Sequence, residues 1–291
     1  MGHPLLERGK EKIILFDGAM GTMLLSAGLS QGKSPEAWNL ERPSLIAEIH
    51  RRYFEAGSDV VHTNTFGGNP LKLVNQGLAD QMELINVEAV RIARNVCPAG
   101  KFVAGDMGPT GKLLKPFGDG TPEALEECFR EQARALVKGG VDFISIETIF
   151  SLQEALAAVR GAKAIGNVLV IVSMTYNRTK KGFFTIMGEN VEQCVAALEQ
   201  EGADVIGSNC TLGSRDMIDL TKEIRAATKK PILIQPNAGK PVTRKGVTTY
   251  EQQPAEFARD GKQIKEAGAE MIGGCCGTNA DFISELARAL S

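Results

Sequence analysis

Four segments of this chain with the character of helices end in closely related phrases, and each phrase leads directly into an apolar run. The phrases are Glu-Ala-Gly-Ser-Asp before Val60, Lys-Gly-Gly-Val-Asp before Phe143, Glu-Gly-Ala-Asp before Val205 and Glu-Ala-Gly-Ala-Glu before Met271. Glycine readily takes the left-handed conformation that ends a helix before a short turn. The repetition therefore indicates that one helix-to-strand unit is used several times.

Apolar runs of strand length alternate with segments of helix length along all 291 residues. Most of these runs are continuously apolar, as expected for parallel strands that are covered on both faces. The expected strands are 12–17, 59–65, 102–106, 142–148, 168–175, 204–210, 231–236 and 271–275, and the expected helices are 44–56, 80–96, 122–138, 151–164, 191–200, 214–227, 255–266 and 281–290. Eight such pairs predict an α/β fold of the (β/α)8, or TIM-barrel, type, with a doubly wound open sheet as the alternative. No linker divides the sequence, so residues 1–291 are expected to form a single domain.

Charge and the N-terminal segment argue against several classes of protein. The 33 Lys and Arg are interspersed with 35 Asp and Glu, for a net charge of -2, so no basic stripe predicts nucleic-acid binding. No apolar run approaches the length of a membrane span, and the N-terminus lacks the apolar core of a signal peptide. Six cysteines in such a chain do not indicate a disulfide framework. We therefore expect a cytoplasmic protein that binds neither nucleic acid nor membranes.

Three cysteines form the most informative pattern of reactive groups. Cys275 and Cys276 are adjacent within Gly-Gly-Cys-Cys-Gly-Thr, a segment that cannot readily close a disulfide, and Cys210 ends another expected strand. In a barrel the C-terminal strand ends meet at one mouth, so the three thiols can lie together. Three thiolates suit a catalytic Zn2+ with an open fourth position, whereas the alternative is three inert, buried thiols. The other cysteines fall on expected helices and are interpreted as packing residues: Cys97, Cys128 and Cys194.

Two acidic residues are expected at the same mouth. Asp17 follows the first strand in Asp-Gly-Ala-Met-Gly-Thr. Here a carboxylate lies beside free backbone N–H groups, so the carboxylate can bind the ammonium group of an amino acid and the N–H groups can bind its carboxylate, an arrangement called an amino-acid clamp below. The alternative for Asp17 is a turn in which it caps the next helix. Glu147 interrupts the apolar fourth strand, and because a buried Glu is rare unless paired, a role at the mouth is favoured over a structural ion pair.

Other polar residues near strand ends are ambiguous, because each can line the site or serve as a loop or cap residue. They are Asn64, Thr65, Asp106 and Asn237. No glycine-rich segment has the spacing of a dinucleotide or P-loop motif. The three histidines lack zinc-ligand spacing and do not favour a His-based hydrolase.

Six short segments, taken in order, resemble a single family. They are Asp-Gly-Ala-Met-Gly-Thr, Thr-Asn-Thr-Phe, Gly-Asp-Met-Gly-Pro-Thr-Gly, Asn-Cys, Gln-Pro-Asn-Ala-Gly and Gly-Gly-Cys-Cys-Gly-Thr, within a match from Ile13 to Leu290. The chain resembles the homocysteine S-methyltransferases, most closely the homocysteine-binding domain of cobalamin-dependent methionine synthases. The cysteine pair with an upstream Asn-Cys is specific to this family, whereas the glycine loops alone are not.

The resemblance implies a zinc-dependent methyltransferase that acts on homocysteine. It implies that Cys210, Cys275 and Cys276 bind Zn2+ and that the homocysteine sulfur becomes the fourth ligand, as a thiolate that attacks a methyl group to give methionine. In the methionine-synthase branch, an asparagine that matches Asn237 is a zinc ligand that the substrate displaces. The chemistry agrees, because the thiolate is the nucleophile and zinc deprotonates a coordinated thiol.

The resemblance also implies how the amino-acid part of the substrate is held. Asp17 and Glu147 are expected to hold its ammonium group, and the backbone N–H groups of Gly18 and Ala19 are expected to face its carboxylate. The chain departs from the family at His62, where methionine synthases carry an acidic residue before Thr-Asn-Thr-Phe. Contacts near the second strand therefore remain unassigned by the resemblance.

The methyl donor is the least determined part of this assignment, because family members use methylcobalamin, S-methylmethionine or betaine. A betaine site requires an aromatic cage, and the chain has one Trp and three Tyr, with Trp38 not aligned to the cage tryptophan of the betaine branch. The first loop and Asn237 favour methylcobalamin as the donor. The methylcobalamin is expected on a separate corrinoid protein or domain, because the folate, cobalamin and activation regions of methionine synthases have no counterpart in these 291 residues.

The alternatives are S-methylmethionine or betaine as donor, or a non-enzymatic zinc-thiolate subunit that binds a thiol. Asp17 and Glu147 argue against that subunit, which needs no amino-acid clamp.

Overall fold

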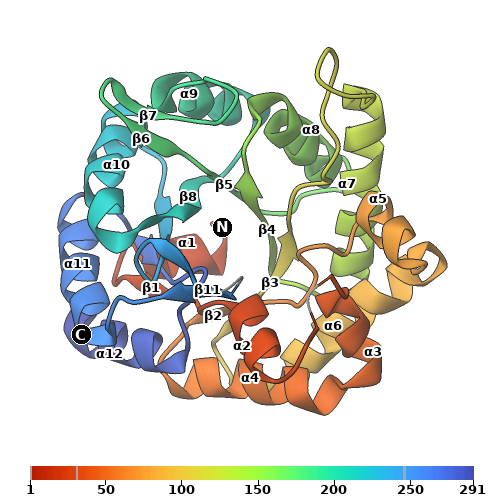
Figure 1. The fold of residues 1–291 in the computed structure, drawn as a ribbon, viewed down its shortest axis with the longest axis horizontal. Coiled ribbons are helices and arrows are strands. Elements are labelled where there is room, and N and C mark those ends of the chain that lie inside the picture. The colour runs from red at the N-terminus through yellow and green to blue at the C-terminus, as the bar shows by residue number, and fades with distance from the viewer. Residues whose placement is uncertain (1, 31, 245–246) are drawn as a thin grey trace.

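The computed structural model describes residues 2–30, 32–244 and 247–291, which form a (β/α)8 barrel (Figure 1). In this part of the chain the main sheet has eight parallel strands in the order β1-β12-β9-β8-β5-β4-β3-β2. A parallel bridge between Phe16 and Val60 joins the two ends of this order and closes the barrel. The strands are β1 (Ile14–Leu15), β2 (Val60–His62), β3 (Phe102–Met107), β4 (Phe143–Ile149), β5 (Val170–Met174), β8 (Val205–Gly213), β9 (Ile232–Asn237) and β12 (Met271–Ile272). Each strand lies within or overlaps an expected apolar run, so the predicted barrel is confirmed.

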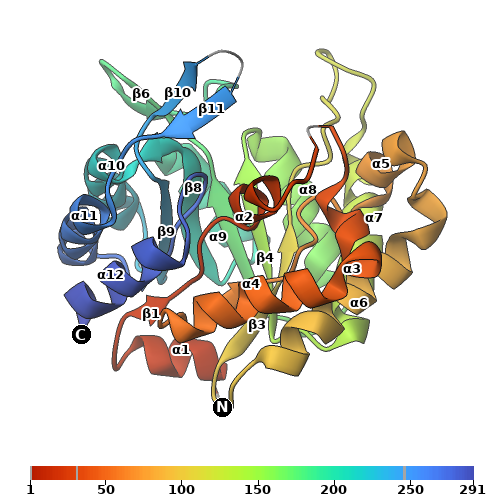
Figure 2. The same cartoon turned by 60° about the horizontal axis from the view of Figure 1, so that its bottom comes forward.

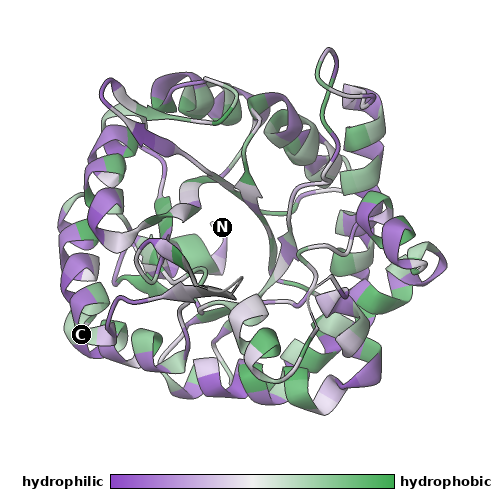
Figure 3. Cartoon of the chain, in the orientation of Figure 1, coloured by the Kyte–Doolittle hydropathy of each residue, from purple (hydrophilic) through white to green (hydrophobic). Residues whose placement is uncertain are grey.

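The helices lie outside the sheet and turn their apolar faces towards it (Figures 1 and 3). The longer helices that follow the barrel strands are α4 (Pro43–Glu55), α6 (Met82–Val96), α7 (Pro122–Gly139), α8 (Leu152–Lys163), α9 (Val191–Glu201), α10 (Ser214–Ala227), α11 (Pro254–Glu266) and α12 (Ala280–Leu290). All eight correspond to helices expected from the sequence. Among the described residues, no helix combines the length and apolar character that crossing a membrane requires.

Glycine ends the helices where the repeated phrases predict it. Gly57, Gly140, Gly202 and Gly268 have φ values of 112°, 95°, 101° and 111°. A side chain would be strained in this left-handed conformation, so the glycines allow each helix to stop and the chain to enter the next strand at once.

The interior of the barrel is apolar at one end and polar at the other. Residues from all eight barrel strands or next to them, and from α1 (Pro4–Gly9), form a buried apolar cluster: Leu5, Ile14, Phe16, Val60, Phe102, Ala104, Phe143, Leu169, Ile171, Val205, Leu233 and Met271. Two residues further along their strands, at positions that face the same way, the buried side chains become polar: His62, Asp106, Ser145, Ser173 and Gln235. This polar layer lies at the C-terminal strand ends, where TIM barrels hold their active sites.

Shorter elements cover the two ends of the barrel. The helix α1 closes the N-terminal end, whereas two hairpins stand at the opposite end (Figure 2). The hairpins are β6 (Asn177–Thr179) with β7 (Gly182–Phe184) and β10 (Pro241–Arg244) with β11 (Val247–Tyr250). The loops after β1 and β2 contain α2 (Met20–Ser26), η1 (Pro35–Ala37), α3 (Trp38–Glu41), α5 (Pro70–Leu73), η2 (Val74–Gln76) and η3 (Ala79–Gln81). The sequence analysis did not predict these elements, because they are too short to show a periodic pattern.

Close packing of α8 against α7 depends on a glycine, which gives a test of the packing. A Cβ at Gly161 would lie 2.5 Å from the carbonyl oxygen of Glu126 and 2.9 Å from the backbone nitrogen of Arg130, and neither backbone group can move aside. We expect Gly161→Ala to lower the free energy of unfolding by about 1–3 kcal/mol, as overpacking does. The matched control is Gly21→Ala in α2, where nothing lies within 4 Å of the added Cβ and stability should be unchanged or slightly raised. Urea unfolding of both variants measures the difference, and equal midpoints would contradict this account.

Candidate metal and substrate site

The three predicted thiols meet at the mouth of the barrel. Cys210 lies in β8, and Cys275 and Cys276 follow β12 after two glycines. The three Sγ atoms lie within 4.8 Å of one another, and those of Cys210 and Cys276 are 3.8 Å apart. All three are free thiols, and they lie apart from Cys128 in α7 and Cys194 in α9. The three thiols that were expected to meet at the mouth therefore do lie together.

The geometry of the trio fits a tetrahedral metal ion. Zinc binds thiolate sulfur at about 2.3 Å, so two sulfurs of one tetrahedral site lie about 3.8 Å apart. The Cys210–Cys276 separation is 3.8 Å, which matches this value. Three soft sulfur donors from the protein also leave one position of a tetrahedral zinc site open.

A fourth donor lies between the two cysteine strands. In the sheet order, β9 separates β12 from β8, and Asn237 is its last residue. Backbone hydrogen bonds from Cys275 N to Pro236 O (2.8 Å) and from Ala238 N to Cys276 O (2.9 Å) tie this strand end to the cysteine turn. The Asn237 Oδ1 atom is buried and has no hydrogen-bond partner among the described residues. An unpaired buried oxygen is costly, so this atom is suited to accept a ligand.

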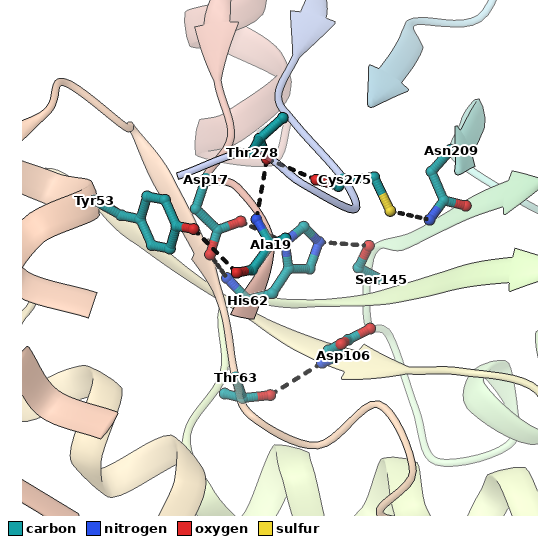
Figure 4. Close-up of polar contacts among 10 residues, drawn as sticks. All are labelled: Asp17, Ala19, Tyr53, His62, Thr63, Asp106, Ser145, Asn209, Cys275 and Thr278. Atoms are coloured by element: carbon teal, nitrogen blue, oxygen red, sulfur yellow. Dashed lines mark hydrogen bonds and ion pairs between the residues drawn. The ribbon is translucent and has the colours of Figure 1, made fainter. Parts of the chain in front are cut away.

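Asn209 joins the thiols to the fourth strand. Its Oδ1 accepts a hydrogen bond from the backbone N–H of Thr148 (2.7 Å), and its Nδ2 donates to Thr148 Oγ1 (2.8 Å) and to Cys275 Sγ (3.7 Å; Figure 4). Thr148 has φ 61°, and Cys210 and Thr211 have φ 58° and 59°, a conformation that these residue types rarely adopt. Backbone strain of this kind concentrates at functional sites. The Asn209 side chain holds the strained turn that follows Glu147.

The three thiols share their protons unequally. Hydrogen bonds from Cys210 and Cys275 stabilise a thiolate at Cys276 and lower its pKa to about 3. Hydrogen bonds with Cys210 and Cys276, together with burial, raise the pKa of Cys275. The trio without a cation therefore favours a single thiolate, because further negative charges would repel one another.

The loop after β1 lies against the cysteine turn. The backbone of Asp17 accepts a hydrogen bond from Gly274 N (2.9 Å), and Ala19 N donates to Thr278 Oγ1 (3.2 Å). A Cβ at Gly18 would lie 2.8 Å from Thr278 Oγ1, so a glycine is needed for this approach. The N-cap of α2 is Ala19, without a side-chain cap, so Asp17 does not cap the helix as the alternative interpretation had it.

The Asp17 carboxylate is instead bound by His62, a residue that was not assigned a role from the sequence. His62 Nδ1 lies 2.8 Å from Asp17 Oδ1, and the backbone N–H of His62 donates to Asp17 Oδ2 at 2.8 Å (Figure 4). The other ring nitrogen of His62 lies 3.1 Å from Ser145 Oγ. Burial lowers the His62 pKa, but the carboxylates of Asp17, Glu147 and Asp106 outweigh it and raise the pKa to about 9. At neutral pH His62 is therefore a cation paired with Asp17.

Two further carboxylates share this region. Burial raises the pKa of Glu147 to about 7, with His62 opposing and Asp17 adding to the shift. Burial and the charge of Glu147 raise the pKa of Asp106 well above its usual range. The structure thus brings together Asp17, Glu147 and Asp106. Of the two alternatives considered for Asp106, this position agrees with lining the site rather than with a loop or cap role.

The other ambiguous residues hold loops in place. Asn64 Nδ2 donates to Pro35 O (2.8 Å) and to Asn39 Oδ1 (3.0 Å), and Thr65 Oγ1 donates to Asp106 O (2.8 Å). Sequence reasoning gave no role to His62 or Asn209, although a signal existed for both. Each is a polar residue near the end of an apolar run, an even number of positions after a residue of the interior apolar cluster: His62 follows Val60 by two positions, and Asn209 follows Val205 by four.

Comparison with known proteins gives a consistent result. Residues 14–290 match the model of the family described as homocysteine S-methyltransferase. The chain is 34% identical to the methionine synthase of Mycobacterium leprae and 32% identical to that of Mycobacterium tuberculosis, over 99% of its own length and 25% of theirs. The chain thus spans about a quarter of these relatives.

A solved structure resembles the barrel over its full length. The metallated form of the homocysteine methyltransferase MmuM from Escherichia coli superposes with a TM-score of 0.82 and 25% identity, covering 98% of this chain and 99% of that one. Its oxidised form gives a TM-score of 0.83 with 25% identity over 100% of both chains. A methyltransferase from Methanosarcina mazei, 13% identical over 98% of this chain and 96% of that one, has a TM-score of 0.64 and shares the fold.

The buried Asp17–His62 pair predicts a specific pH dependence of stability. His62 has a pKa of about 9 in the folded chain against 6.5 for an ordinary His, so its contribution is fully present below about pH 6.5 and is lost as the pH rises through about 9. We expect the wild type to exceed His62→Gln in unfolding free energy by up to about 3 kcal/mol more at pH 6.5 than at pH 9.5. Urea unfolding at both pH values measures this, and Asp17→Asn should lose the same dependence. A difference between wild type and His62→Gln that stays constant with pH would rule out the charged pair.

Proposed function

Because the chain belongs to the homocysteine S-methyltransferase family, we propose that its barrel, residues 1–291, is one homocysteine-binding domain of a zinc-dependent methyltransferase that forms methionine. The methyl donor in this proposal is methylcobalamin on a separate corrinoid protein or domain. Family membership agrees with the enzyme class expected from the sequence. The observation that carries the metal and substrate assignment is the cluster of Cys210, Cys275 and Cys276 at the barrel mouth, with sulfur spacing suited to one tetrahedral ion.

Cys210, Cys275 and Cys276 would hold the zinc, with Asn237 as a ligand that the substrate replaces. When bound, zinc would keep a coordinated thiol in its thiolate form near neutral pH. The chain itself supplies the orientation, since the Asn209 hydrogen bond fixes Cys275 and the β9 backbone fixes the cysteine turn. The metallated form of the similar Escherichia coli protein supports a metal in this fold.

Glu147 and Asp17 supply negative charge for the substrate ammonium in this proposal. Both lie within electrostatic range of His62, and Glu147 is also close enough to Cys276 for their charges to interact. Gly18 and Ala19 would present backbone N–H groups to the substrate carboxylate, although Ala19 N already donates to Thr278 Oγ1, so that bond would be shared or exchanged. A sulfur ligand site and an ammonium site at one mouth match the two ends of homocysteine.

Two observations favour a corrinoid donor over betaine or S-methylmethionine. One is that the chain is 34% identical to a methionine synthase over 99% of its own length. Trp38 is buried with Arg42 stacked on its ring, and Tyr176 is buried in the core, so neither contributes to an aromatic cage at the thiols. Tyr250 is the aromatic residue that contacts Cys276.

The zinc assignment predicts metal loss on removal of one sulfur. Cys275→Ala leaves two thiols, which bind zinc far more weakly, so metal content should fall from about one equivalent per chain to a small fraction of that. The matched control is Cys97→Ala, a partly buried cysteine next to the end of α6, which should keep its zinc. Elemental analysis of the purified proteins measures the content. Full retention of zinc in Cys275→Ala would refute the ligand set.

The donor assignment predicts which methyl compound supports turnover. Methylcobalamin with homocysteine should give methionine and cob(I)alamin, because the corrinoid cobalt is a good leaving group and the acceptor is a thiolate. Parallel assays with methylcobalamin, S-methylmethionine and betaine rank the donors, with Cys276→Ala as the inactive control. Methionine formation from S-methylmethionine or betaine alone would assign a different donor. No turnover with any of the three, together with tight thiol binding, would point to the non-enzymatic alternative.

A further inference from the structure

Asp106 has the features of a ligand-binding group that the proposed mechanism leaves unused. It is the fifth residue of β3, and its neighbour in register is Ser145 on β4 (Figure 4). The side chain is 94% buried, given a relative exposure of 6%. Its Oδ1 atom has no hydrogen-bond partner among the described residues. A buried carboxylate oxygen without a partner is among the most costly groups a fold can contain, so it indicates a missing ligand.

The position of Asp106 is continuous with the proposed ammonium site. Ser145 and Glu147 alternate along β4 and so face the same way, towards the interior of the barrel that Asp106 also faces. The charges of Asp106 and Glu147 act on each other, and both act on His62. Asp106 and Glu147 therefore lie on neighbouring strands at the same mouth.

Among the described residues, neither His62 nor Lys72 hydrogen-bonds to the Asp106 carboxylate, although both lie within electrostatic range of it. His62 bonds to Asp17 with its ring and with its backbone N–H, and its second ring nitrogen faces Ser145. Both oxygens of Asp17 are thereby engaged, whereas no hydrogen bond to the Asp106 carboxylate is found in the described part of the chain. Asp106 and Glu147 thus lack a hydrogen-bonded cation among the described residues, although the charge of His62 lowers the pKa of both.

We propose that Asp106 binds the ammonium group of the substrate together with Glu147, while His62 holds Asp17 in place beside them. This inference rests on the proposed function, which it extends by a residue and by a division of roles. Burial and the charge of Glu147 destabilise the ionised Asp106, as its raised pKa indicates, and a bound ammonium would relieve both. Asp17 then acts mainly through His62, as a positioning residue.

A ligand that differs only in the ammonium group tests this assignment. We suggest titration calorimetry with homocysteine and with 4-mercaptobutanoate, which has the same thiol and carboxylate but no amino group, on protein purified with zinc. Asp106→Asn should weaken homocysteine binding by about tenfold to a hundredfold, the range for a charge-assisted hydrogen bond, and should not weaken 4-mercaptobutanoate binding. Glu147→Gln should show the same selectivity. Zinc content should be unchanged in both variants.

The matched control is Asp119→Asn, an exposed carboxylate on the loop after β3, which should change neither affinity. Equal weakening of both ligands by Asp106→Asn, or no weakening of homocysteine, would overturn the assignment while leaving the homocysteine proposal intact. A wild type that binds neither ligand would instead refute the proposed function itself. If Asp106→Asn does not fold by circular dichroism, Asp106→Ser takes its place, since the hydrogen bond that the backbone N–H of residue 106 donates to Thr63 Oγ1 does not involve this side chain.

Discussion

Closure of the parallel sheet is the constraint on which the rest of this molecule depends. Parallel strands in a closed barrel place all of their C-terminal ends on one rim. Cys210 and Cys275 come from β8 and β12, which do not pair with each other, and β9 between them contributes Asn237. Closure through the Phe16–Val60 bridge brings Asp17 against β2 and, through Gly274, against the cysteine turn. Without closure Asp17 and His62, which come from the two ends of the strand order, would lie at opposite edges of an open sheet.

The rim divides into two chemically different halves. The strands β8, β9 and β12 carry sulfur and amide donors, which are suited to a soft metal and a thiol. The strands β1 to β4 carry three carboxylates and one imidazole, which are suited to an ammonium group. Each half gathers acidic groups in buried surroundings, which disfavour the ionised form of several of them, so each half is suited to bind a cation.

The sequence was sufficient to predict the barrel and the meeting of the three thiols, because both predictions depend on short local patterns of residues. Apolar runs give the strands, the glycine phrases give the helix ends, and Cys275 and Cys276 are neighbours in the chain. The partner of Asp17 could not be predicted in this way. His62 lies 45 residues away from it, and their contact depends on the register between β1 and β2, which side-chain periodicity does not specify. The short helices and hairpins at the mouth were missed for a related reason, since their stability comes from tertiary packing rather than from a repeated pattern.

Asn209 connects the two halves, and its position explains why strained backbone is retained there. Residues in the left-handed conformation cost about 1–3 kcal/mol each, and Thr148, Cys210 and Thr211 all adopt it. The Asn209 side chain offsets part of this cost by bonding to the backbone and the hydroxyl of Thr148. The same amide group contacts the thiol of Cys275, and Thr148 directly follows Glu147. A shift of the thiols would therefore move the irregular part of β4 next to Glu147, so this one side chain links the position of the thiols to that of the carboxylate.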